Sequence, residues 1–362
     1  MLGIYLQASC IVSLFFSIII SILWWFTEPV LIFLHQTHDI SKEAALYLRY
    51  LIPGIFAYGL LQNILRFLQM QSVVLPLVGL SLVPLLLHCG LTYVLVYCTT
   101  LGYKGAALAT SLTFWLAVIM LFIYVNFAKR FEDTWKGLSK ESFSYVFTNL
   151  KLALPSAAMV VLSTGHLRSW CCWLASCQIL KAQLLSLQFA IAYMFTYGLG
   201  AATSTRVSNE LGAGNTNKAK QAMGVSLKLI IVLASLVLLA LGFGHDIWAG
   251  FFSGNPSIIK AYASMTILLC ISIFFDSIQG ILSGVCRGSG WQHLAMYINL
   301  GTFYMIGMPI ACLLAFKFHF YAKGLWIGVV CGLIAQSSLL FLITKLHQWE
   351  ALEVSPNNRA DF

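Results

Sequence analysis

The sequence has little charge. Only 9% of its 362 residues are Asp, Glu, Lys or Arg, against about 25% in a typical soluble domain. Hydrophobic residues make up 60% of the chain, and its mean hydropathy is +0.86. A single water-soluble core of this length cannot bury so much apolar side chain, so lipid must contact much of the surface. The composition excludes an ordinary soluble protein and predicts an integral membrane protein.

Several chemical motifs are also missing. The ten cysteines have no zinc or redox spacing, and the basic residues punctuate apolar runs instead of forming a nucleic-acid face. The glycine pair in STRVSNELGAGN (204–215) follows no strand, so it is no nucleotide-binding loop. A membrane-embedded acyl transferase needs a His/Asp pair, but His88 and Asp276 lie in distant spans. These absences argue against an ATP-driven pump, a nucleic-acid-binding protein and an enzyme.

Apolar runs are abundant instead. A helix needs about 20 apolar residues to cross the ~30 Å hydrocarbon layer. Ten runs meet this criterion, of which the fifth and sixth are the weakest: 10–34, 44–66, 73–98, 105–127, 150–173, 187–205, 225–244, 262–285, 294–316 and 325–344. The predicted fold class is an all-α polytopic membrane helical bundle.

Loop charges orient these spans. Of the 21 Lys and Arg residues, thirteen fall on one side of the predicted membrane, six fall on the other, and Arg168 and Lys181 lie in the doubtful region. Basic residues favour the cytoplasmic side. The 128–150 loop and the C-terminus are therefore predicted to be cytoplasmic.

Two parts of the sequence resemble each other. LLQNILRFLQMQ (60–71) resembles SIQGILSGVCRG (277–288), and each precedes a proline-containing span and then YKGAAL (103–108) or AKGLWI (322–327). Spans two to four thus correspond to spans eight to ten, unless Leu- and Gly-rich helices match by chance. An even offset of six spans predicts copies of equal orientation, the parallel type of transporter repeat. Twelve spans complete this pattern, so we expect two further helices ahead of Met1.

Asp276 is the one acidic residue well inside a predicted span. Hydrocarbon penalises a charged side chain by about 2.5–3.5 kcal/mol, so an acid at this depth indicates function. Gly280, Gly284 and Gly288 follow at four-residue steps and let another helix approach closely. We expect Asp276 to face the bundle interior and to bind and release a proton; a neutral, hydrogen-bonded structural aspartate is the alternative.

Three amide side chains are candidates for lining a substrate cavity: Gln279 on the helix of Asp276, and Gln62 and Asn63 in the first half of the chain. For each of them alone, hydrogen bonding between helices is the simpler interpretation. His88 is interpreted as a hydrogen-bonded core residue, and no metal site is predicted.

Five segments have specific sequences: MLGIYLQ (1–7), LRFLQMQSVVLPL (65–77), LPSAAMV (154–160), STRVSNELGAGN (204–215) and DSIQGILSGVCRGSGWQ (276–292). They resemble the multidrug and toxic compound extrusion (MATE) family, in its plant detoxification branch. The resemblance implies twelve helices in two six-helix lobes that exchange protons, sometimes sodium, for organic solutes. In the family, MLGIYLQ lies at the start of the third helix, so the resemblance implies an N-terminally truncated chain with about ten helices.

The resemblance also implies domains and a function. We expect an N-terminal lobe over 1–130, a cytoplasmic linker over 131–149, a C-terminal lobe over 150–345 and a cytoplasmic tail over 346–362. The implied activity is proton-coupled antiport that exports xenobiotics, organic cations or plant secondary metabolites. The expected protein is a monomer in the vacuolar or plasma membrane, with the lipid bilayer, small organic solutes and protons as its partners. It uses the proton gradient and no cofactor, and it binds no nucleic acid.

One segment departs from the family. Residues 163–188 are polar where the seventh helix is expected, and suitable synonymous codons for 162–181 read in another frame as EYWAFEVVVLLAGLLPNPK, which resembles that helix. We hypothesise a frameshift that opens after Leu162 and closes near Phe189. In eukaryotic relatives the first glutamate of this helix couples protons together with the acid matching Asp276, and Ser163 stands in its place here. An inactive relative of the transporter is therefore the alternative function.

Overall fold

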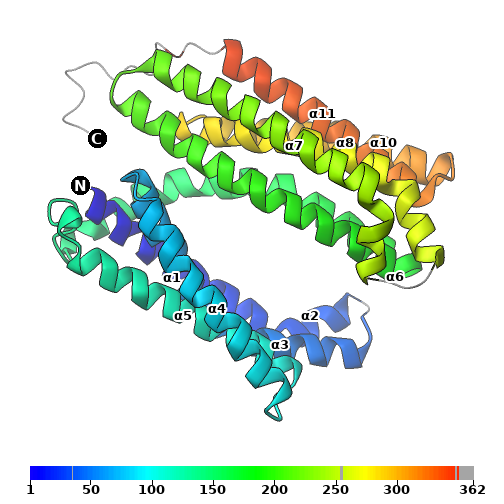
Figure 1. Ribbon diagram of the computed structural model, residues 1–362, viewed down its shortest axis with the longest axis horizontal. Helices are drawn as coiled ribbons and strands as arrows, with labels where there is room; N and C mark the ends of the chain where they lie inside the picture. The colour runs from blue at the N-terminus through cyan, green and yellow to red at the C-terminus, as the bar shows by residue number, and fades with distance from the viewer. Residues whose placement is uncertain (35, 253–255, 347–348, 350–362) are drawn as a thin grey trace. The chain divides into compact units, whose positions relative to one another are not determined.

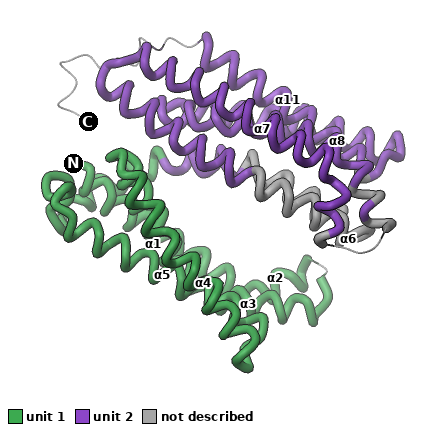
Figure 2. The backbone as a smooth tube through the Cα atoms, in the orientation of Figure 1, with its two compact units in different colours: residues 1–152 green, residues 153–362 purple. Residues whose placement is uncertain are grey.

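The computed structural model describes the backbone of residues 1–34, 36–252, 256–346 and 349. It also describes their side chains, except those of 162–192, 251–252, 256–258, 260–262 and 322. Within these residues every regular element is helical (Figure 1). The prediction of an all-α bundle is confirmed. The chain divides into two compact units, residues 1–152 and 153–362 (Figure 2).

Five helices build most of unit 1: α1 Leu2–Trp25, α2 Thr27–Phe33, α3 His38–Met70, α4 Leu75–Tyr97 and α5 Tyr103–Phe127. Two short 3₁₀ helices follow, Lys129–Phe131 and Lys140–Tyr145. The core of this unit lies between α1, α3 and α5, around the buried Leu6, Ile64 and Leu68.

Unit 2 contains most of α6 Val146–Gly212, then α7 Thr216–Phe252, α8 Pro256–Gly288, α9 Gln292–Leu300, α10 Met308–Cys312 and α11 Tyr321–Leu346. Two π-helical segments, Gly301–Gly307 and Leu313–Lys317, follow α9 and α10, so 292–317 form one continuous helical stretch. Figure 1 shows α7, α8 and α11 running side by side, and α8 packs against both of the others.

Eight of the ten predicted spans correspond to helical segments long and apolar enough to cross a membrane. The other two, 150–173 and 187–205, fall within α6. The side chains of the whole segment 163–188, with the hypothesised frameshift and Ser163, lie outside the described set. Large apolar side chains such as Phe243 and Met305 are exposed on the helix surfaces, where lipid would contact them.

The first predicted span, 10–34, has the wrong bounds. The helix begins at Leu2 and ends at Trp25. After Phe26, α2 begins with its own series of backbone hydrogen bonds. Pro29 has no N–H to donate to the carbonyl of Trp25, and the guanidinium of Arg49 lies 3.5 Å from that oxygen instead. The proline therefore divides what hydropathy alone presents as one span.

A second proline shapes the contact between α3 and α5. Pro53 lies inside α3 and removes one backbone hydrogen bond there. Around it, the Ser111 hydroxyl donates to the carbonyl of Tyr50 at 3.0 Å, and the indole of Trp115 donates to the carbonyl of Pro53 at 3.1 Å. Side chains of the neighbouring helix thus hydrogen-bond the backbone carbonyls beside Pro53, as membrane helices require.

The two copies of the internal repeat pack in the same way. A Cβ atom added to Gly105, in YKGAAL, would collide with the carbonyl oxygen of Leu95. A Cβ atom added to Gly324, in AKGLWI, would lie 2.7 Å from the carbonyl carbon of Leu314. In both units the motif glycine thus lets a helix begin against the end of the preceding span, ten residues earlier. This shared contact supports an internal repeat rather than chance similarity.

The predicted linker over 131–149 packs within unit 1. Gln7 of α1 donates to the carbonyl of Gly137 at 2.7 Å, and the backbone N–H of Ser139 donates to the Gln7 side chain at 2.9 Å. Phe131 is buried against Phe67. The single amide of Gln7 therefore satisfies two backbone groups and holds this segment onto α1.

Replacing Gln7 by leucine removes both hydrogen bonds and leaves two backbone groups without their partner. We expect Gln7→Leu to destabilise unit 1 by about 1–3 kcal/mol. The measurement is the thermal unfolding midpoint in detergent. Gln221→Leu, at an exposed position of α7, is the matched control and should behave like the parent chain. Equal midpoints for the two variants would contradict this assignment.

Candidate functional site

A buried polar stripe runs along α8. Ser272, Asp276, Gln279 and Ser283 follow one another at steps of four, three and four residues, which places them on one helix face. All four side chains are at most 8% exposed. Polar side chains in hydrocarbon are unfavourable unless they are paired or functional, so this stripe is the strongest candidate site in unit 2.

Asp276 is the one carboxylic acid among the buried side chains that the structure describes. Its burial agrees with the expected position inside the bundle. No ion pair joins it to any described basic group. When Asp276 gains or loses a proton, the charge inside unit 2 changes. None of the described basic residues forms an ion pair that would neutralise the carboxylate. This arrangement can couple proton binding to helix packing.

The three cavity candidates occur in different settings. Gln279 donates to the Ser283 hydroxyl at 2.8 Å, along its own helix. In unit 1, Asn63 donates to the Ser13 hydroxyl on α1 at 2.7 Å, and Gln62 is half-buried. The hydrogen bond of Asn63 joins two helices, which is the simpler interpretation for these amides. The hydrogen bond of Gln279 stays within one helix. The imidazole of His88 lies 3.1 Å from the Thr113 hydroxyl, so the expected hydrogen bond is present, but the side chain is half-buried rather than in the core.

The three glycines of α8 meet the C-terminal half of α6. A Cβ atom added to Gly280 would collide with the methyl group of Thr196, and one added to Gly284 with the carbonyl oxygen of Gly200. One added to Gly288 would lie 2.5 Å from the carbonyl oxygen of Ser204. Both helices present small residues at four-residue steps, so their backbones approach closely. The hydroxyls of Thr196 and Ser277, 3.3 Å apart, add a polar contact.

A second polar cluster was not predicted. Asn299 of α9 donates to the carbonyl of Met159 on α6 at 2.8 Å, and Gln336 of α11 donates to the side-chain oxygen of Asn299 at 2.6 Å. Both amides are 0% exposed. Each amide interrupts an apolar span, but nothing in the sequence around it indicates which side chain it meets.

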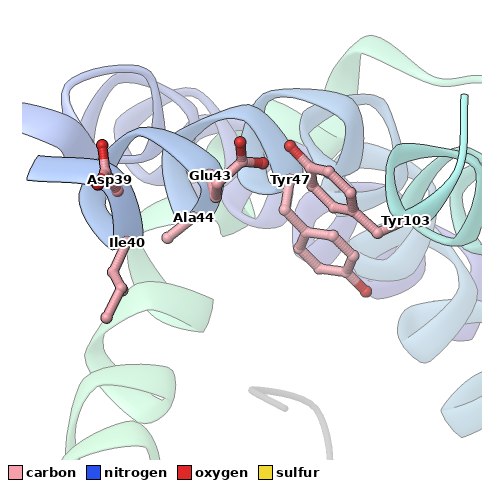
Figure 3. A pocket seen from close by; sticks show the side chains of 6 residues that line it. All are labelled: Asp39, Ile40, Glu43, Ala44, Tyr47 and Tyr103. Carbon is pink, nitrogen blue, oxygen red and sulfur yellow. The ribbon is translucent and has the colours of Figure 1, made fainter.

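Two pockets lie among the described residues of unit 1. One of about 620 Å³ lies between α1, α3, α5 and the 135–143 segment; Ile64 lines it, but neither Gln62 nor Asn63 does. The other, of about 410 Å³, lies beside the first turns of α3 (Figure 3). There the Tyr103 hydroxyl points toward the Glu43 carboxylate, and the ammonium of Lys104 lies 5.8 Å from the centre of the Tyr103 ring. Among the described side chains, no three His, Cys, Asp or Glu residues could hold a metal ion.

Comparisons with known proteins bear on the whole chain. The MatE family model matches residues 1–94 and 181–313. Protein DETOXIFICATION 18 of Arabidopsis thaliana is 52% identical over 97% of this chain and 76% of its own length. Protein DETOXIFICATION 16 of the same plant is 40% identical over 100% of this chain and 75% of its own. The crystal structure of the eukaryotic MATE transporter AtDTX14 is similar with a TM-score of 0.92 and 33% identity, over 97% of this chain and 80% of that one.

The close contact between α8 and α6 generates a prediction. Gly284→Leu places a side chain against the backbone of Gly200, which cannot move without breaking α6. We expect loss of folded, monodisperse protein on size-exclusion chromatography in detergent, because overpacking is strongly destabilising. Gly242→Leu is the matched control, since no described atom lies within 4 Å of a Cβ built there. Normal elution of Gly284→Leu would contradict the packing.

Proposed function

The chain belongs to the MatE family of transporters, and we propose that it exports small organic solutes across a membrane in exchange for protons. Members of this family are membrane efflux transporters rather than enzymes. The proposed solutes are xenobiotics, organic cations or plant secondary metabolites. We propose that the protein acts as a monomer in the lipid bilayer. It uses the proton gradient and no further cofactor.

The observation that carries the proposal is the buried carboxyl of Asp276 on the polar stripe of α8. In the proposed cycle Asp276 takes up a proton from the acidic side of the membrane. The two halves of the transporter then rock, and the carboxyl releases its proton on the other side as solute is exchanged. Gln279, Gln62 and Asn63 are proposed to contact the solute at some stage of this cycle.

Asp276→Asn tests the proton step. The amide has nearly the same shape but no titratable proton. Export driven by a pH gradient should therefore fall roughly tenfold or more, a size typical of the coupling between two ligand sites, here those for the proton and the solute. The measurement is uptake of a fluorescent organic cation into proteoliposomes with an imposed pH gradient. Asp246→Asn, whose carboxylate is exposed and lies 3.3 Å from His245, is the control and should match the parent chain.

Two results would overturn this function. One is transport by Asp276→Asn that equals that of the parent chain. The other is leakage of the dye that does not depend on the gradient. An inactive relative is the second candidate, favoured by the polar sequence at 163–188, and it predicts no dye movement by the parent chain.

We also propose a vacuolar or plasma-membrane location with the C-terminus and the 128–150 segment in the cytoplasm, because basic residues gather on that side. A protease-sensitive tag at the C-terminus should be cleaved when protease is added to the cytoplasmic face of sealed vesicles. It should resist protease added to the opposite face. The reverse pattern would invert the topology.

A further inference from the structure

The hydrogen bonds of the Asn299–Gln336 pair determine which atom is left over. The carbonyl of Met159 can only accept, so Asn299 must direct its NH₂ group toward it. Its oxygen then faces Gln336, which must in turn present its own NH₂ group. The side-chain oxygen of Gln336 is therefore an acceptor with no described partner, on a side chain that is 0% exposed.

The position of Gln336 on α11 shows what this oxygen lies near. Leu333 and Leu340, three residues before it and four after it, are buried on the same helix face. Leu333 belongs to the cluster that packs against Phe275 of α8, and Leu340 to the one that contains Leu282 of α8. Gln336 thus lies on α11 between residues of two clusters to which α8 contributes Phe275 and Leu282, and Asp276 and Gln279 lie between those two residues on α8.

A direct contact strengthens this placement. The hydroxyl of Ser337, the neighbour of Gln336, lies 3.0 Å from the carbonyl oxygen of Phe275, the neighbour of Asp276. The two helices therefore touch one residue away from Asp276 on α8 and one residue away from Gln336 on α11. Both polar groups lie inside unit 2, away from solvent.

An unpaired acceptor at 0% exposure is unfavourable, and a water molecule bound by two or more polar groups is the common remedy in protein interiors. We propose that Gln336 holds a water molecule inside unit 2 and that this water carries protons to and from Asp276. A hydronium ion at this site transfers one proton to a carboxylate oxygen of Asp276 and remains as water; the reverse step returns the proton. Toward this water the side-chain oxygen of Gln336 accepts a hydrogen bond and orients the molecule without taking up the proton, so Gln336 is a positioning residue. This inference rests on the proposed function.

Gln336→Met tests the inference, because methionine has a similar length but no hydrogen-bonding oxygen. The parent chain and the variants are reconstituted in proteoliposomes with a fluorescent organic cation. Exchange is measured with a pH gradient and, separately, as cation-for-cation exchange without one. For Gln336→Met the gradient-driven rate should fall about tenfold, while the rate without a gradient should stay within about twofold of the parent. Ser338→Ala, an exposed neighbour bonded to its own helix, should change neither rate.

The alternatives give different patterns. If the pair only ties helices together, Gln336→Met and Asn299→Leu will lower both rates and the unfolding midpoint alike, and the inference is wrong. If Asp276→Asn abolishes gradient-driven exchange while Gln336→Met matches the parent chain, the inference fails and the proposed function stands. If the parent chain shows no gradient-driven exchange, both fail together.

Discussion

The structure depends on one constraint: polar groups within a hydrocarbon layer must find their partners inside the protein. The constraint is most visible where the helices are interrupted. The carbonyl of Trp25, deprived of a donor by Pro29, is approached by Arg49. Next to Pro53, two side chains of α5 reach backbone carbonyls of α3. At both of these prolines, side chains from another helix thus approach the backbone carbonyls.

Glycine makes these pairings possible by bringing helices close together. In unit 1, a Cβ on Gly54 would lie 2.8 Å from the Ser111 hydroxyl oxygen, the same hydroxyl that donates to the backbone of α3. In unit 2, the glycines of α8 admit the backbone of α6, and the polar stripe occupies the adjacent face. Close packing on one face therefore fixes the position of the acid on the next, because a helix held by its backbone cannot rotate freely.

Sequence reasoning found the features that a single helix reveals. Asp276 was identifiable because charge in an apolar span is unfavourable, and Gly280, Gly284 and Gly288 because they recur at helical spacing. It missed the amide pair, because the sequence around a neutral amide in an apolar span does not indicate which distant side chain it meets. It also gave the first span wrong bounds, since hydropathy averages over about 20 residues and smooths over the effect of Pro29.

The sequence by itself determined the class of protein, eight of its membrane helices, the internal repeat and the buried acid. These follow from composition and periodicity, which are properties of short stretches of chain. Only the tertiary structure decided which groups meet. Asn299 contacts Met159 across 140 positions of sequence and Gln336 across 37. A hydrogen bond requires two atoms within about 3 Å of each other, and that register between helices is set by packing over their whole length rather than by any local pattern.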